Sequence, residues 1–182
     1  IWRKRLGRDR FSIAFYERAV LATAWLYQMI CPLSGNGPNI GANDGSHLLQ
    51  LTDSCYRDFR PSVQLASNLF NERLAYSENG PWNTHLAWLG IINKEEKPLN
   101  YVNCDYDSGG YKVMRTTCAN IIFRFPKFHF RPGQADAMHL DLWVHGSNLL
   151  ADAGSYSYNS VPDWSCYFSG TASHNTVQFD DR

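Results

Sequence analysis

The sequence predicts an α+β fold in which helices come first and an antiparallel sheet follows. Apolar residues recur with the period of a helix over residues 11–29 and 61–76. After residue 110 the pattern changes to period-two alternation in short runs, with no helical pattern between them. Strands without intervening helices form antiparallel sheets or sandwiches. The change of pattern near Lys94–Pro98 places the domain boundary between residues 1–97 and 98–182.

The N-terminal part is expected to consist of helices joined by long loops. Its first helix ends at Cys31-Pro32, because the residue before a proline is pushed out of the helical region. Residues 35–45 (GNGPNIGANDG) form a glycine- and asparagine-rich loop, which lacks the Lys-Ser/Thr of a phosphate-binding loop. The next helix covers residues 61–76 with Pro61 in its first turn, and a weaker pattern covers residues 84–92.

The C-terminal part is expected to contain five short strands. The runs with strand character are residues 111–117, 119–125, 138–144, 148–151 and 176–179. Gly109-Gly110 and His145-Gly146 are typical of hairpin turns, and the second is placed to turn one strand back into the next.

Composition and charge exclude several classes of protein. The chain has 182 residues, with 17 Lys+Arg against 17 Asp+Glu, so it lacks the basic surface expected of a nucleic-acid-binding protein. The longest apolar run, residues 19–30, is too short for a membrane helix. The five cysteines are widely spaced with no CxxC pair, so we expect free thiols rather than a zinc ribbon. The chain begins at Ile1 without a signal peptide, and we expect it to be part of a longer protein.

Three blocks in the C-terminal part resemble the heparinase II/III-like family of bacterial polysaccharide lyases. They are residues 131–146 (RPGQADAMHLDLWVHG), 148–158 (NLLADAGSYSY) and 173–177 (SHNTV), and upstream residues 38–45 (PNIGANDG) resemble a loop near the end of the family's helical domain. The resemblance implies an incomplete (α/α) toroid packed on a β-sandwich. This chain would then hold the end of the toroid and the first strands of the sandwich. It also implies a periplasmic or extracellular location.

The resemblance further implies a structural metal position in the sandwich. The family's zinc ligands fall on Gln134, Asp152 and His174. An amide oxygen is a poorer zinc ligand than an imidazole, so the residues favour an ion-free hydrogen-bonded cluster over zinc.

Catalysis in this family is β-elimination from a uronate, in which a base removes the proton at C5 and an acid protonates the departing O4. The family's sandwich-borne catalytic His falls on Pro132, which cannot transfer a proton. His129, three residues earlier, is the nearest substitute, with a solvent-facing loop residue as the alternative. Tyr156 and Tyr167 are the candidate catalytic tyrosines, because the family places such a residue in this part of the sandwich.

The expected partner is an acidic polysaccharide. Trp164 and its neighbouring tyrosines offer flat apolar surfaces for pyranose rings, and packing in a core or interface is the alternative. Arg60 and Arg131 are candidate ligands for uronate or sulfate. Asn43 is a candidate substrate ligand, with an Asx-turn that caps a helix as the alternative.

Two functions remain open from the sequence. The first is a lyase that cleaves an acidic polysaccharide. The second is a binding or assembly protein of the same fold in exopolysaccharide handling, with proton-transfer groups altered at Pro132 and Gln134. The sequence gives no oligomeric state.

Overall fold

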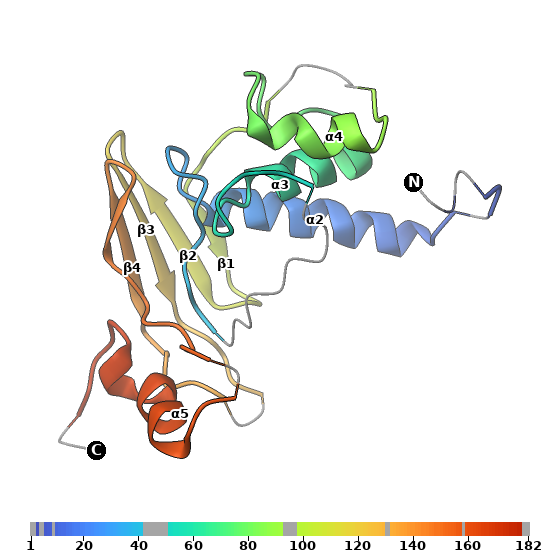
Figure 1. The fold of residues 1–182 in the computed structure, drawn as a ribbon. Coiled ribbons are helices and arrows are strands. Elements are labelled where there is room, and N and C mark those ends of the chain that lie inside the picture. The colour runs from blue at the N-terminus through green and yellow to red at the C-terminus, as the bar shows by residue number, and fades with distance from the viewer. Residues whose placement is uncertain are drawn as a thin grey trace. The chain divides into compact units, whose positions relative to one another are not determined.

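The structure is a computed structural model that describes residues 3, 6–8, 10–41, 51–92, 98–129, 132–157 and 159–179. It contains two compact units, shown in Figure 1. A helical unit comprises residues 1–27 and 60–99, and a sheet unit comprises residues 28–59 and 100–182. The predicted α+β class, helices followed by an antiparallel sheet, is confirmed.

The first described helix, α2, spans Ile13–Met29. Ser12 precedes it, and the Ser12 hydroxyl accepts a hydrogen bond from the Phe15 amide at 3.2 Å, which satisfies a free N–H of the first turn. At the other end, Tyr27 and Met29 are buried. The Tyr27 hydroxyl donates to the Leu99 carbonyl at 2.6 Å. This hydrogen bond links the two segments of the helical unit, residues 1–27 and 60–99.

The helical unit continues with α3 (Arg60–Ala66), a π-helical turn (Ser67–Asn71), a 3₁₀ turn (Pro81–Asn83) and α4 (Thr84–Trp88). The predicted helix over residues 61–76 therefore stops five residues early. Gln64 gives the physical reason, because its buried side chain binds backbone that a helix would use internally. Its Oε1 accepts from the Ala75 and Tyr76 amides at 2.9 and 3.0 Å, and its Nε2 donates to the Tyr76 carbonyl at 3.0 Å.

The sheet unit is a five-stranded antiparallel meander in which neighbouring strands follow chain order (Figure 1). Its strands are β1 (Cys104–Tyr106), β2 (Tyr111–Arg115), β3 (Ala119–Arg124), β4 (Leu140–Val144) and β5 (Ser147–Leu150). His145 and Gly146, which join β4 to β5, have φ of 48° and 84°. Two consecutive positive φ angles are the geometry of a tight two-residue hairpin, so this predicted turn is confirmed.

One predicted strand was wrong, and two elements were not predicted. Residues 176–179 form no strand, because the Thr176 hydroxyl bonds to the Ala137 carbonyl and its neighbour Asn175 bonds to β4 and the loop after β5. Strand β1 was not predicted, since three residues give too little alternation to detect. Helix α5 (Pro162–Ser169) was also missed, although Pro162 at its start and Asp163 in its first turn are favourable residues at a helix N-terminus.

Residues 28–59 belong to the sheet unit rather than to the helical unit. The two units are therefore not separated by a single boundary at residue 97. The Arg115 guanidinium on β2 donates to the carbonyls of Gln28 and Ile30. The Phe59 amide donates to the Gly35 carbonyl at 2.9 Å, which closes this segment on itself.

One face of the sheet carries the buried residues of this unit. Val113, Ile122 and Asp141 lie opposite one another on β2, β3 and β4, and Asn120 lies opposite Trp143. Among the described residues, no helix is long and apolar enough to cross a membrane.

Candidate functional site

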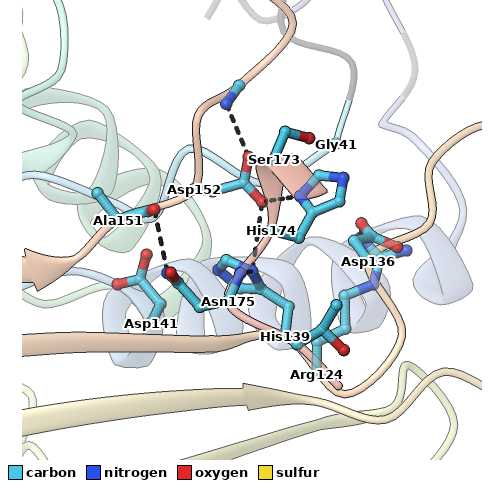
Figure 2. Close-up of polar contacts among 12 residues, drawn as sticks. Gly41, Arg124, Asp136, His139, Asp141, Ala151, Asp152, Ser173, His174 and Asn175 are labelled. Carbon is cyan, nitrogen blue, oxygen red and sulfur yellow. Dashed lines mark hydrogen bonds and ion pairs between the residues drawn. The ribbon is translucent and has the colours of Figure 1, made fainter. Parts of the chain in front are cut away.

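Three segments far apart in the sequence meet at the start of β4. They are residues 134–140, 151–154 and 173–176, and they include parts of all three blocks that the sequence singled out. The Leu140 amide donates to the Asn175 carbonyl at 2.9 Å, and the Asn175 side chain donates to the Ala151 carbonyl at 3.0 Å. Figure 2 shows these segments and the polar side chains that they bring together.

At the centre of this junction lie His139, Asp152 and His174, which we call the polar cluster (Figure 2). Their side chains are at most 1% exposed. Asp152 Oδ2 lies 2.9 Å from His174 Nδ1 and 3.6 Å from His139 Nδ1, and Asp152 Oδ1 accepts from the Gly154 amide at 2.7 Å. The carboxylate therefore lies between two imidazoles and is held by backbone on its other side.

The protonation of His139 follows from its surroundings. Burial lowers the pKa of His139, and the nearby Asp152 carboxylate opposes this shift. The Asn175 amide donates to His139 Nδ1 at 3.1 Å, so that nitrogen accepts and carries no proton. The neutral form is the one in which histidine binds metals.

The polar cluster fits a metal ion. Two imidazoles and a carboxylate are a common zinc donor set, and the donor atoms lie within 4.8 Å of one another. Among the described residues, the buried Nε2 atoms of His139 and His174 have no hydrogen-bond partner, so both rings retain unused polar atoms.

Charged and polar groups on the neighbouring strands surround the polar cluster. Burial raises the pKa of Asp141 to about 6, although the Asn148 side chain and the Trp143 indole N–H donate to its carboxylate. On β3, Arg124 pairs with Asp136, whose side chain is 1% exposed.

The third side chain of the polar cluster is His139, whereas the resemblance placed the third metal ligand at Gln134. Gln134 is half-buried, and among the described residues its Oε1 has no hydrogen-bond partner. The sequence does contain a pattern that indicates burial of His139. His139, Asp141 and Trp143 are spaced by two residues, and all three are buried on the same side of the strand.

A second feature is a group of stacked aromatic rings on and beside α5, which we call the aromatic platform. It consists of Tyr156, Trp164, Tyr167 and Phe168. The rings of Tyr156 and Phe168 are stacked at 5.5 Å and 9°, and Trp164 lies 5.7 Å from Tyr156 and 5.9 Å from Phe168. Tyr156, Trp164 and Tyr167 are 72%, 51% and 52% exposed, so the platform presents apolar rings to solvent.

The other predicted site residues are dispersed. His129 is exposed in the loop after β3, and Pro132 is exposed in the following segment. Arg60 belongs to the helical unit and lies over the Trp82 ring at 4.7 Å. Arg131 and Asn43 lie outside the described residues.

Comparison with solved structures identifies the fold. Two structures of a heparinase III gene product, the first with methylated lysines, match this chain. The first has a TM-score of 0.66 at 19% identity over 93% of this chain and 24% of its own length. The second has a TM-score of 0.57 at 16% identity over 85% and 22%. The helices and sheet therefore have the fold of the corresponding part of a heparinase.

Sequence comparison points to the same group of proteins. Residues 104–182 match the family model "Heparinase II/III-like, C-terminal". A heparin-sulfate lyase from Bacteroides stercoris is 25% identical over 140 residues, which are 72% of this chain and 20% of the relative. The chain thus spans about a fifth of the length of the curated relative that it matches.

Proposed function

We propose that the protein containing this chain is a polysaccharide lyase that cleaves an acidic, uronate-containing polymer by β-elimination. In this reaction a base takes the C5 proton, the C4–O4 bond breaks, and an acid protonates the departing O4. The products are one fragment with a new reducing end and a second fragment with an unsaturated uronate at its non-reducing end. The match of residues 104–182 to the heparinase II/III-like family model supports the reaction class.

The aromatic platform is the observation that carries the proposal. A contiguous group of exposed aromatic rings is typical of an interaction site, and flat rings stack on the apolar faces of pyranoses. The ring centroids of Trp164 and Tyr156 lie 5.7 Å apart, with the ring planes tilted by 32°. We propose that they hold successive sugars of the polymer. Tyr156 and Tyr167 are the candidate proton-transfer groups, His129 is the candidate acid, and Arg131 and Asn43 are candidate substrate ligands.

We also propose that the polar cluster holds a structural zinc ion through His139, Asp152 and His174. When bound, such an ion links segments that are distant in the sequence and stabilises the fold. The support is the donor chemistry of the cluster, in which two imidazoles and a carboxylate have ligand atoms within 4.8 Å of one another. A periplasmic or extracellular location accompanies the proposed substrate.

The experiment measures cleavage and binding separately on the purified full-length protein. Alginate, heparin-type and hyaluronan-type polymers are supplied, and the ultraviolet absorbance of unsaturated uronate reports elimination. Isothermal calorimetry reports binding. Trp164→Ala should weaken binding by about tenfold, the upper range for an aromatic contact. Trp88→Ala is the matched control, because Trp88 is 71% exposed on α4 in the helical unit.

A second candidate function is binding without cleavage, as in an exopolysaccharide assembly protein. Pro132 favours it, since this residue occupies the position of the family's catalytic His and has no proton to transfer. Binding that depends on Trp164, with no absorbance change on any polymer, would select this function. Equal polymer affinity in the Trp164→Ala and Trp88→Ala variants would reject the role of the platform.

A further inference from the structure

A pocket of about 470 Å³ lies in the sheet unit, at the opposite end of β4 from the polar cluster. Its lining includes Arg115, Asn120 and Trp143, which are paired neighbours on β2, β3 and β4. Leu33, Tyr101 and Cys118 also line it. Neither the polar cluster nor the aromatic platform contributes a residue to this lining.

Asn120 is the unusual residue of the pocket. The residue is 4% exposed, yet among the described residues neither its Oδ1 nor its Nδ2 has a hydrogen-bond partner. Leaving a buried polar group unsatisfied costs about 1–3 kcal/mol, and here both ends of one amide are unsatisfied. A sheet interior would be more stable with an apolar residue at this position, so the amide points to a ligand that supplies one donor and one acceptor.

The pocket lining defines the chemistry of that ligand. Trp143 and Tyr101 provide aromatic surface, and Asn120 provides the paired donor and acceptor that match adjacent hydroxyl groups. Arg115 contributes a positive charge, while the lining residues include no Asp or Glu. Arg115 is held in place, because it donates to the Ile30 carbonyl at 3.0 Å and lies over the Tyr101 ring at 4.5 Å.

We propose that this pocket binds a single acidic sugar, a pyranose ring that carries a carboxylate. The ring would lie against Trp143, its hydroxyl groups would pair with the Asn120 amide, and its carboxylate would be attracted by Arg115. The site is separate from the aromatic platform and its occupancy does not depend on polymer cleavage. It would allow the protein to bind a monomeric uronate as well as the polymer.

Cysteine protection tests this site with internal controls. Cys118 is an exposed free thiol in the pocket lining, whereas Cys55 and Cys166 are exposed free thiols outside it. Full-length protein is alkylated with iodoacetamide, and mass spectrometry gives the rate at each cysteine. Glucuronate at ten times its dissociation constant should slow alkylation of Cys118 by about tenfold and leave Cys55 and Cys166 unchanged. Glucose, the neutral counterpart, should protect much less.

Two variants connect the result to the pocket. Asn120→Leu should abolish the protection of Cys118, with unchanged rates at Cys55 and Cys166 as evidence that the fold is retained. Trp164→Ala should leave the protection intact, which separates this site from the proposed polymer site. The proposal is overturned if glucuronate protects no cysteine, protects all three equally, protects no better than glucose, or still protects Cys118 in the Asn120→Leu variant. In each of those cases the Asn120 amide has some other partner, such as an ordered water.

Discussion

The Nδ1 atom of His174 lies 2.9 Å from Oδ2 of Asp152, and both side chains are completely buried. A buried carboxylate in this position is stable only while its hydrogen-bonding neighbours remain. Asp152→Asn keeps the shape and removes the charge, and it should lower the free energy of unfolding by about 1–3 kcal/mol. Denaturant titration checks this. Asp105→Asn, at an exposed ion pair with Lys112, should cost less than about 1 kcal/mol, and equal losses in the two variants would contradict the prediction.

The metal content of the purified protein tests the donor set of the polar cluster. We expect one zinc per protein molecule, lost in His139→Ala and retained in Gln134→Ala, because only the imidazole belongs to the cluster. Inductively coupled plasma mass spectrometry gives the ratio. A protein without zinc at any stage of purification would support the ion-free cluster instead, and zinc lost on changing Gln134 would restore the ligand set expected from the sequence.

The ion pair between Arg124 and Asp136 should be costly to break. Asp136 is 1% exposed at its side chain, so Arg124→Met leaves a buried carboxylate without its cation. Removing one partner of a buried pair costs about 3–5 kcal/mol. Lys112→Met, at the exposed pair with Asp105, is the control and should cost less than about 1 kcal/mol. The double variant Arg124→Met, Asp136→Leu should recover much of the loss, and a double variant as unstable as the single one would refute this account.

Gly110 should tolerate no side chain. Its φ is 66°, and a Cβ atom would lie 2.5 Å from Pro126 Cα and 2.6 Å from the Phe125 carbonyl oxygen. Both obstacles are backbone, so Gly110→Ala should destabilise the protein by more than about 1 kcal/mol. At Gly133 no atom of the described residues lies within 4 Å of the corresponding Cβ position, so Gly133→Ala should be close to neutral. Thermal unfolding of the two variants gives the comparison.

Alkaline pH should destabilise the sheet through two tyrosines that face each other on β1 and β2. Burial raises the pKa of Tyr106, aided by a hydrogen bond with Cys104, and burial raises the pKa of Tyr111, opposed by Arg124. Above about pH 10, the ordinary pKa of the phenol, the unfolded chain releases protons that the folded chain retains. The free energy of unfolding should therefore fall as the pH rises through this value. Urea titration between about pH 9 and pH 11 measures this decrease in the free energy of unfolding. The decrease should be smaller in Tyr106→Phe and Tyr111→Phe, and an unchanged pH dependence in both variants would contradict the prediction.

The sequence predicted the elements whose pattern is local. The period of the Ile13–Met29 helix, the alternation of β2, β3 and β4, and the His145-Gly146 turn can each be recognised within a few residues. The early end of α3 could not, because it depends on the Gln64 amide binding backbone more than ten residues away.

The candidate site was predicted in part. Asp152 and His174 were identified by their blocks and lie in contact. The sequence does not assign His139 to the site, because a histidine on a strand has the same local pattern whether it packs in a core or approaches a carboxylate 13 residues further along the chain. The stacking of Tyr156 on Phe168 could not be predicted either, since it depends on α5, a helix of 8 residues that is too short to show a clear period.

The chain-order arrangement of the five strands has a consequence for how this unit folds. Each strand pairs with the next along the chain, so the sheet can grow by successive hairpins with short loop closures. The polar cluster, in contrast, needs residues 139, 152 and 174 together, and these can meet only after β4 and β5 have paired. We therefore expect this junction to form late, after the rate-limiting step. Changes within it should speed unfolding and leave the folding rate nearly unaltered.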